Sequence, residues 1–353
     1  MKLNKIAIKS LIKRADLALQ ANYRSVVDKS IIPPSGDLHD YLSRAVYFWP
    51  DSSKVDGLPW VGKDGKYNFK SFEETDHKYY YQVMGAIRDL SLAYFFSLDI
   101  KYATKTSDLI KFWFINESTH MNPNFNFAQA IPGHNYGSPG GIIDGRAILW
   151  VIEAINLINP SKKFSDENEI LFKEWCTKYL KWLLESDFGE KESKAPNNHG
   201  TFYYAQVAKF ADYLKRKEIV IQTLEGVKKR RIENQILPDG SFPPELERAE
   251  AFTYSVFHLS AYFELAKLGD KYGIELWNYK TEQCGSIIDA YYFILNNAVL
   301  SNNWKYKGKI DYDYFLGLIF TASEKFDANI EIVMKKIQNN VRNPKITDLY
   351  FIY

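Results

Sequence analysis

Apolar residues recur at the spacing of an α-helix through most of this chain, and this periodicity limits the fold more than any other feature. One helix is predicted over 76–97, where apolar side chains share a face at Val83, Ile87, Leu90 and Tyr94. Strand-like alternation is scarce. Other stretches with helical spacing, separated by Asn, Asp, Ser, Pro or Gly, predict further helices over about 3–24, 100–115, 141–158, 166–187, 199–215, 218–236, 250–268, 281–298, 309–322 and 326–339. The pattern therefore predicts an all-α fold.

The connections between these helices are short, which favours antiparallel neighbours, and a long run of such hairpins closes most simply into a ring of helix pairs. A chain of 353 residues would suggest two domains at roughly 150 residues each. We nevertheless predict a single domain over 1–353, because that rule is only a prior and some single-domain architectures are longer. No residue-level repeat marks the chain as a solenoid.

Composition excludes several classes of partner. The chain carries 45 Lys and Arg against 43 Asp and Glu, so its net charge of +2 creates no field that would attract nucleic acid or anionic lipid. No segment reaches the roughly 18 apolar residues that a membrane span needs. The two cysteines, Cys176 and Cys284, lie apart in apolar helical contexts, and we expect both to be buried free thiols.

Two segments interrupt the helical pattern, over 32–75 and 116–141, and both are longer than a compact domain usually tolerates without a functional reason. Both are rich in aromatic residues, which argues against a solvated, disordered linker. We expect them to fold over the helices and shape a cleft. The alternative is that their aromatic side chains only seal the end of a helical bundle.

The first candidate site lies at the start of the helix predicted from residue 199. Asn197, Asn198 and His199 stand where exposed backbone N–H groups favour an anion. Amide donors beside an imidazole suit a carboxylate whose charge must be neutralised. The same residues could instead form only a cap and a turn.

The second candidate site lies farther along, at Arg248 and Tyr254. The Arg248 guanidinium can pair with a carboxylate through two parallel hydrogen bonds. The two residues are six positions apart, so both can serve one pocket only if Arg248 precedes the helix and Tyr254 projects from its first turn. Alternatively, Arg248 pairs with Glu245 or Glu247, and Tyr254 is an ordinary half-buried aromatic residue.

Four blocks of residues, in the same order, resemble the alginate lyase superfamily of helical polysaccharide lyases. The run KSIIPPSGDLHDYLSRAVYFWPD, at 29–51, resembles the opening loop of that superfamily. The later blocks are Thr119 to Pro123 with Gln129, Asn197 to Gly200, and Arg248 to Tyr254. The resemblance spans about residues 20–270 and favours the branch that acts on alginate or glucuronan.

The resemblance implies an incomplete (α/α) toroid with long loops forming a cleft, and β-elimination at a uronic acid. This reaction requires that the sugar carboxylate be neutralised before the C5 proton can leave, and Asn198, His199 and Arg248 supply that set. A base must then remove the C5 proton while an acid protonates the departing O4. We assign Tyr254 as the acid and base, with His199 as the alternative base for the C5 epimer. A free tyrosine has a pKa of about 10, so nearby positive charge must favour the phenolate.

The family motifs also suggest residues that bind the substrate. These are predicted to be Tyr41, Arg44, Trp49, Asn122, Gln129, Asn197 and Glu245. For Asn122 and Gln129, an equally weighted alternative is that their side chains pin the loops to the scaffold.

Two other functions compete with the lyase. A glycoside hydrolase on a similar helical toroid would use two carboxylates from Asp239, Glu245 and Glu247. A non-catalytic carbohydrate-binding protein would use the aromatic loops alone. The histidines and cysteines show no metal-ligand spacing, and no glycine-rich phosphate loop precedes a helix, so we expect neither a metal nor a cofactor in catalysis.

The first residues of the chain bear on localisation. They alternate basic and apolar side chains and lack the continuous apolar run and cleavage site of a secretory signal. Since relatives of this superfamily are typically periplasmic or secreted, we expect either the mature form of an exported enzyme or a cytoplasmic one.

Overall fold

A computed structural model describes residues 2–301, 303–326, 330–337 and 340–341, and it confirms that helices dominate the chain. The chain packs as two compact units. Unit 1 comprises Met1–Ser10 and Ser193–Tyr353, and unit 2 comprises Leu11–Glu192. The prediction of a single domain stays a prediction, and each unit is described by itself.

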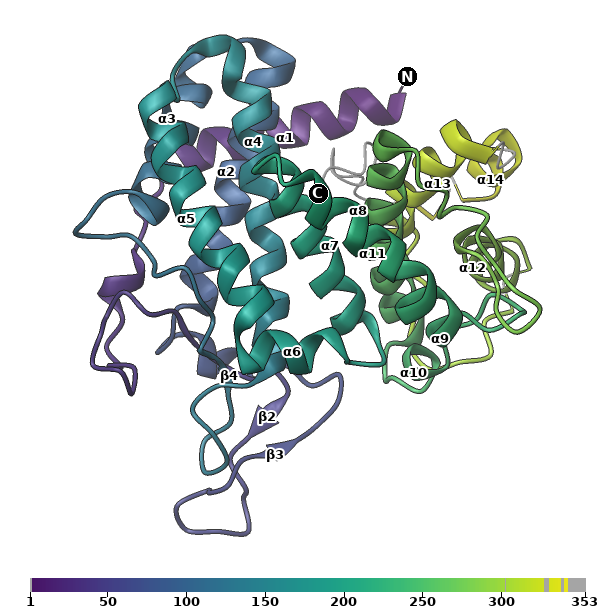
Figure 1. Ribbon diagram of the computed structural model, residues 1–353, viewed down its shortest axis with the longest axis horizontal. Helices are drawn as coiled ribbons and strands as arrows, with labels where there is room; N and C mark the ends of the chain where they lie inside the picture. Colours follow the sequence, from purple (N-terminus) through teal and green to yellow (C-terminus); the bar gives the residue numbers. More distant parts are fainter. Residues whose placement is uncertain (1, 302, 327–329, 338–339, 342–353) are drawn as a thin grey trace. The chain divides into compact units, whose positions relative to one another are not determined.

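Unit 2 is built around a helical bundle in which α2 packs on α3 and α4, and α3 also packs on α5 (Figure 1). The α-helices of the first half of the chain are α1 (Lys2–Gln20), α2 (His77–Ser97), α3 (Ile100–Phe114), α4 (Ile148–Ile158), α5 (Asp166–Glu185) and α6 (Asp187–Ser193). Short 3-10 helices are η1 (Val26–Asp28), η2 (Phe69–Phe72), η3 (Pro139–Ala147) and η4 (Asn159–Ser161).

The two long non-helical segments of unit 2 pair with each other through short strands. Strand β1 (Leu42–Arg44) runs parallel to β4 (Phe127–Ala130), and β2 (Phe48–Trp49) forms an antiparallel pair with β3 (Val61–Gly62). The β2–β3 hairpin extends from one end of the helical bundle (Figure 1). Both segments are therefore ordered, as their aromatic content predicted.

Aromatic side chains fill the core between these loops and the bundle. The Tyr41 ring contacts Tyr80 and Phe125 edge to face, at centroid distances of 5.2 and 5.0 Å, and Tyr80 also contacts Trp113. Edge-to-face contacts of this kind stabilise a core beyond the area they bury. Much of the aromatic content of this chain thus packs helices and loops together rather than facing solvent.

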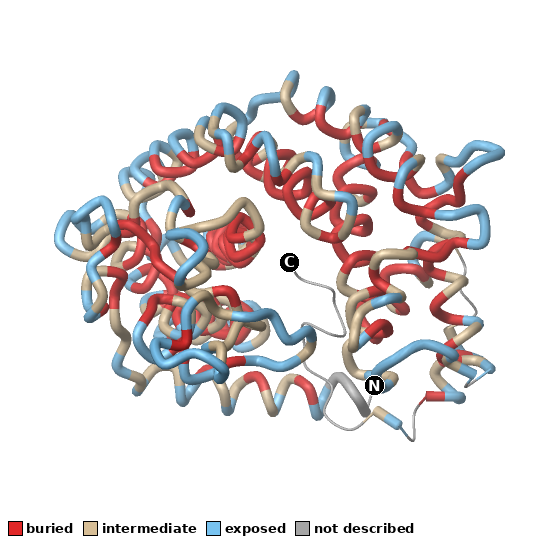
Figure 2. Tube along the Cα trace, turned by 90° about the horizontal axis from the view of Figure 1, so that it is seen from below, coloured by how far each residue is buried: buried red, intermediate tan, exposed pale blue. Residues whose placement is uncertain are grey.

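Unit 1 is a second set of packed helices, in which α7 contacts both α8 and α11 (Figure 1). Its elements are α7 (Asn198–Tyr213), α8 (Lys217–Val227), a π-helical turn η5 (Lys228–Ile232), α9 (Glu233–Gln235), α10 (Pro243–Leu246), α11 (Ala251–Tyr272), α12 (Ile287–Ile294), a second π-helical turn η6 (Leu295–Leu300), α13 (Tyr312–Phe326) and α14 (Ile330–Ile337). Buried residues run through these helices, and exposed residues lie mainly on loops and outer turns (Figure 2).

Most predicted helices match observed ones to within a few residues, and the exceptions lie at short or irregular elements. Helices α6 and α10 were missed because they are short, and the helix predicted over 218–236 is divided by the π-helical turn η5. The first part of the helix predicted over 141–158 is the 3-10 helix η3, and the helix predicted over 281–298 begins only with α12 and ends in η6. The helix predicted over 326–339 appears as α14, and 327–329 and 338–339 lie outside the described residues. Both cysteines are buried free thiols, as expected. No helix in the described part of the chain is long and apolar enough to span a bilayer.

Candidate active site

The start of α7 is fixed by internal partners on both of its first two residues. The Asn197 side chain accepts a hydrogen bond from the His199 backbone N–H at 3.2 Å, which caps the helix. The Asn198 backbone N–H donates to Glu245 Oε1 at 2.8 Å. The N–H groups of Asn198 and His199, which were expected to attract a substrate anion, therefore already have partners, and the anion that Asn198 meets is the carboxylate of Glu245.

Glu245 holds the side chain of Asn198 as well as its backbone. Asn198 Nδ2 donates to Glu245 Oε1 at 2.9 Å and lies 3.0 Å from Oε2. Glu245 is 0% exposed and Asn198 only 1%. Burial alone would raise the pKa of Glu245, but the neighbouring His258 ring and the Asn198 donors hold it below its usual value. Glu245 therefore has a positioning role here rather than the predicted contact with sugar.

A buried polar network continues from Glu245 into the interior of unit 1. His258 Nδ1 lies 3.3 Å from Glu245 Oε1, and His258 Nε2 lies 2.7 Å from the Thr201 hydroxyl. Gln235 Oε1 accepts from Thr201 and from Tyr262, at 2.8 and 2.6 Å. Burial lowers the pKa of His258, so this imidazole is neutral at neutral pH. The network ties α7, α9, α10 and α11 together beneath the Asn198–His199 pair.

Arg248 and Tyr254 meet as the helical geometry required. Arg248 lies in the turn between α10 and α11, and Tyr254 stands in the first turn of α11. The Arg248 guanidinium carbon is 3.6 Å from the centroid of the Tyr254 ring. Both side chains are half-buried, so Tyr254 does not point into the hydrophobic core. A positive charge thus lies directly against the phenol.

The two candidate sites are connected through α10. The Arg248 backbone N–H donates to Glu245 O at 3.3 Å, and Glu245 in turn holds Asn198. One turn further along their helices, the rings of Phe202 in α7 and Phe257 in α11 pack at a centroid distance of 4.4 Å. The first turns of α7 and α11 therefore lie side by side, and they carry His199 and Tyr254 respectively.

Of the predicted substrate-binding residues in unit 2, Arg44 and Trp49 are half-buried and retain some exposed surface. Arg44 pairs with Glu74 at 2.7 Å, and its guanidinium also lies 5.2 Å from the ring of Trp60. Trp49 donates to Lys66 O at 3.0 Å, which fixes the plane of its indole. These rings and the guanidinium could contact a sugar.

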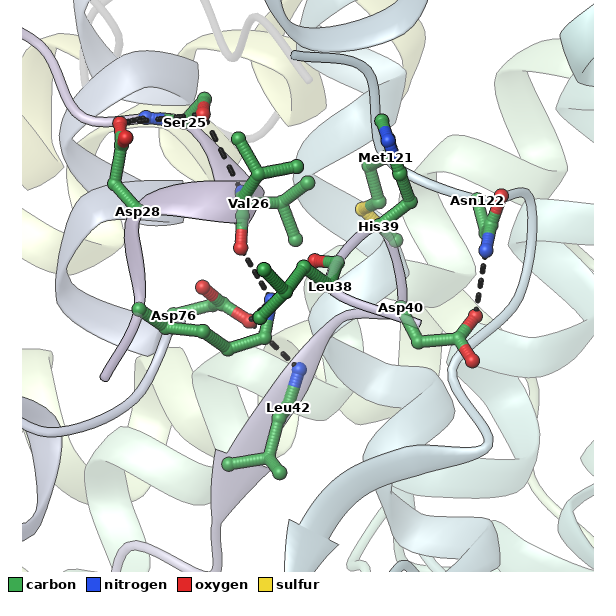
Figure 3. A network of polar contacts seen from close by, with 12 residues as sticks. Ser25, Val26, Asp28, Leu38, His39, Asp40, Leu42, Asp76, Met121 and Asn122 are labelled. Carbon is green, nitrogen blue, oxygen red and sulfur yellow. Dashed lines mark hydrogen bonds and ion pairs between the residues drawn. The ribbon is translucent and has the colours of Figure 1, made fainter. Parts of the chain in front are cut away.

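Tyr41 and Asn122 hold the loops of unit 2 in place. Tyr41 is 0% exposed and donates to Asp144 at 3.0 Å, so it positions the loop instead of lining a sugar site as predicted. Asn122 Nδ2 donates to Asp40 at 2.9 Å (Figure 3) and to Asp37 at 2.9 Å, as in the alternative in which this side chain pins the loops. Gln129 differs, because its backbone is held by Ser43 while no partner of its side chain lies in the part of the chain that the structure describes.

Comparison with known proteins identifies the family. The profile of the alginate lyase family matches residues 25–304 of this chain. A crystal structure of an alginate lyase from Bacteroides ovatus is 32% identical, with a TM-score of 0.90, and the alignment covers 99% of this chain and 93% of that one. The chain belongs to the alginate lyase family. It is therefore a polysaccharide lyase, an enzyme that cleaves polysaccharide by β-elimination, as the motifs predicted.

More distant members of the alginate lyase fold also align along most of the chain. Alginate lyase A1-III from Sphingomonas species A1 is 14% identical with a TM-score of 0.56, over 89% of this chain and 86% of that one. A variant of alginate lyase A1-III in complex with a tetrasaccharide is 13% identical with a TM-score of 0.59, over 90% and 88%. These two similarities support the fold alone. No curated protein sequence matches the chain at a significant level.

Asp239, Glu245 and Glu247 do not provide the pair of catalytic carboxylates that a glycoside hydrolase would require. Both oxygens of Glu245 face Asn198, whereas Asp239 and Glu247 are exposed. Asp239 accepts from the Ser241 backbone and only caps a turn. Among the residues described, no group of three or more metal-ligating side chains occurs.

Sequence reasoning missed a second cluster of cations and aromatic rings, in unit 2 of this alginate lyase. The Arg88 guanidinium lies 4.5 Å from the Trp150 ring, and Arg146 lies 5.3 Å from the Tyr81 ring. Arg146 also donates to the Tyr81 hydroxyl at 2.6 Å. A signal was present, because Tyr81 and Arg88 are seven residues apart in α2, and Arg146 and Trp150 are four apart, so each pair lies close to one helical face.

Proposed function

We propose that this chain cleaves an anionic uronic-acid polysaccharide, alginate or glucuronan, and that Tyr254 is its catalytic acid and base. The observation that carries the proposal is the Arg248 guanidinium stacked 3.6 Å from the ring centroid of Tyr254, in a chain of the alginate lyase family. A tyrosine that only filled space in the core would need no guanidinium against its ring. The pair also lies at the head of α11, beside the first turn of α7 with His199.

The first chemical requirement is to neutralise the sugar carboxylate. The C5 proton of a uronic acid becomes acidic only when the negative charge on the adjoining carboxylate is balanced, so that the carbanion-like transition state is stabilised. Arg248 and His199 are half-buried and close to the surface, and they supply this balance. Asn198 contributes mainly by setting the start of α7, because Glu245 holds its amide.

The second requirement is proton transfer. Tyr254, as the phenolate, removes the C5 proton, the electrons form the C4–C5 double bond, and the bond from C4 to the glycosidic oxygen breaks. The same hydroxyl then returns the proton to the departing oxygen, which leaves the enzyme in its starting state. His199 serves as the base where the C5 proton lies on the opposite face of the sugar.

Unit 2 carries groups of its own that suit an acidic sugar. Half-buried rings such as Trp49 and Trp150 can stack against sugar rings, and Arg44, Arg88 and Arg146 can pair with uronate carboxylates. Charge-assisted pairs of this kind favour an acidic polysaccharide over a neutral one.

The test is the turnover of three polymers by the intact chain and by Tyr254→Phe. We expect ultraviolet absorbance from the new double bond on at least one of mannuronate-rich alginate, guluronate-rich alginate and glucuronan. Tyr254→Phe should lose kcat by about 100-fold or more, since general acid and base catalysis contributes about 10²–10⁴. Tyr272→Phe is the matched control, because Tyr272 lies at the other end of α11, with its hydroxyl bound to Asp212. Full activity of Tyr254→Phe would refute the assignment.

A further inference from the structure

A short segment of unit 1 combines three lysines with two aromatic residues. Its sequence is Trp304-Lys305-Tyr306-Lys307-Gly308-Lys309, and we call residues 304–309 the lysine loop. The match to the alginate lyase profile ends at residue 304, so the lysines lie beyond it. None of the residues assigned to the site above comes from this segment.

The lysine loop is attached to the turn that carries Arg248. The Ala251 backbone N–H, at the start of α11, donates to Lys307 O at 3.1 Å. The Lys309 backbone N–H donates to Glu250 Oε2 at 3.3 Å. The loop is thus bound to the residues between Arg248 and Tyr254, the two members of the proposed catalytic pair.

Gly308 permits this close approach. It adopts φ +88°, a left-handed conformation that favours glycine. A Cβ atom there would lie 2.6 Å from Glu250 Oε2 and 2.7 Å from Glu250 Cα. The lysine loop therefore packs closely against Glu250 at Gly308, where a side chain would clash.

Aromatic packing holds the other side of the lysine loop. The Trp304 ring contacts Phe252 of α11 at 5.8 Å and Tyr306 at 5.0 Å, and Phe293 contacts both Trp304 and Tyr306. Tyr306 still keeps 38% of its surface exposed. All three lysines of the loop are exposed as well, so their side chains face solvent.

The ion pairs of the described residues do not include the three ammonium groups of the lysine loop. In the part of the chain that the structure describes, none of them forms an ion pair with a carboxylate. The nearby acids are occupied otherwise: Glu250 accepts from the loop backbone, and Asp311 accepts from the Tyr314 N–H at 3.1 Å. Three exposed lysines within five residues, on a loop whose backbone is bound to Glu250 and Ala251, therefore present a local positive surface.

We propose that the lysine loop is a further subsite, which binds carboxylates of the uronan chain next to the sugar held by Arg248 and Tyr254. This inference rests on the proposed function. A uronan carries a carboxylate on each sugar, so a polymer held at Arg248 presents further anions to the adjoining surface. Lysine suits such a subsite, because its flexible ammonium acts as a point charge without demanding one geometry.

The test compares two variants that remove the same charge. K305Q/K307Q/K309Q neutralises the lysine loop, and K215Q/R216Q/K217Q neutralises an exposed basic run that leads into the first residue of α8, at the far end of α7 from His199. We expect the loop variant to raise KM for polymer about tenfold at low salt, with kcat within about twofold, since each exposed ion pair adds a modest amount. The rise should shrink as salt screens the charges, and the control should keep KM unchanged.

Binding, measured apart from turnover, separates this inference from the proposed function. Calorimetric titration with size-defined oligouronates should show about tenfold weaker affinity for the loop variant than for the original chain and for the control. An unchanged affinity and KM in the loop variant, or an equal loss in both variants, would overturn the subsite. If no uronan gains a double bond but the loop variant alone loses affinity, the proposed reaction fails and the subsite stands.

Discussion

At the residue scale, the most informative side chain is Glu245, a buried carboxylate that holds Asn198 through its backbone and its amide. Glu245→Gln keeps the shape but places an amide donor against the donors of Asn198. We expect the free energy of unfolding to fall by about 2 kcal/mol at neutral pH, because a hydrogen bond to a charged group is worth about 1.5–3 kcal/mol. We also expect kcat to fall, because the start of α7 and its His199 are no longer held in place. Urea unfolding and double-bond absorbance measure the two effects.

The pH dependence of this loss has a defined sign. The pKa of Glu245 is lower in the folded protein than its usual value, so its contribution to stability is present above the unfolded pKa and is lost as the pH falls through the folded pKa. The difference between Glu245→Gln and the original chain should therefore shrink in acid. Glu247→Gln is the control, since Glu247 is exposed and close in sequence. A difference that grows in acid contradicts this role for Glu245.

Gly200 carries a second prediction at this scale, because its missing side chain makes room for a buried arginine. A Cβ atom on Gly200 would lie 2.0 Å from Arg231 Nη1 and 2.3 Å from Ala195 O, and this Arg231 nitrogen donates to Ala195 O at 2.6 Å. We expect Gly200→Ala to lower the free energy of unfolding by about 2 kcal/mol through overpacking. Denaturant unfolding measures the loss.

Gly226 in α8 supplies the matched control for Gly200→Ala. A Cβ there meets only Tyr204 Cε1, at an ordinary 3.6 Å. Gly226→Ala should therefore raise the stability by about 0.5–1 kcal/mol, the usual gain from replacing glycine within a helix. Opposite signs for the two substitutions support the packing argument, whereas equal gains would contradict it.

At the element scale, a buried ion pair joins the long loop of unit 2 to the start of α2. Lys29 Nζ lies 3.0 Å from Asp76 Oδ2 and donates to Leu38 O at 2.6 Å. Asp76 also accepts from the Leu42 N–H at 2.8 Å (Figure 3). One carboxylate thus holds the chain on both sides of the loop that leads into β1.

Lys29→Met tests this anchor. Removing one partner of a buried pair leaves a charge without compensation, so we expect the free energy of unfolding to fall by about 3–5 kcal/mol. Burial raises the pKa of Asp76 to about 7 even beside Lys29. A carboxyl group whose pKa is raised in the folded protein contributes to stability at low pH, and this contribution is lost as the pH rises through the folded pKa. The loss should therefore be larger at about pH 8 than at about pH 5.

Two further variants control the interpretation of Lys29→Met. The double substitution Lys29→Met with Asp76→Asn should recover part of the loss, because no buried charge remains. Lys54→Met should have little effect, since Lys54 is exposed and lies 3.9 Å from Asp51. An equal loss in Lys29→Met and Lys54→Met would contradict the anchoring role.

The elements were more predictable from sequence than the contacts between them. Apolar periodicity gave α2 and α3 to within a residue or two, because one face of each helix must be buried whatever its neighbours are. The separation of Arg248 and Tyr254 gave only a condition for their meeting, that Arg248 precede the helix and Tyr254 lie in its first turn, and the structure fulfils it. The burial of Tyr41 and Glu245 could not be predicted, since it depends on Asp144 and Asn198, which are distant in sequence.

At the scale of the whole molecule, the balance of charge bears on how a polyanion is recognised. The net charge of +2 gives no long-range attraction, so affinity must come from local cations. Each unit offers its own: Arg248 and the lysine loop in unit 1, and Arg44, Arg88 and Arg146 in unit 2. A uronan carries carboxylates that can pair with cations of this kind, whereas a neutral polysaccharide carries none.

The difference in charge between a uronate and a neutral sugar predicts that only the uronate stabilises the folded protein through these cations. A ligand that binds only the folded state stabilises it by about 2.7 kcal/mol at 100 times its Kd. With Tyr254→Phe, which should bind without turnover, saturating oligouronate should therefore raise Tm, and added salt should reduce the rise because it screens the charges. A neutral oligosaccharide of the same length should leave Tm unchanged. If the neutral sugar raised Tm as much as the uronate, recognition would depend on the aromatic rings, and the cations assigned here would have no part in it.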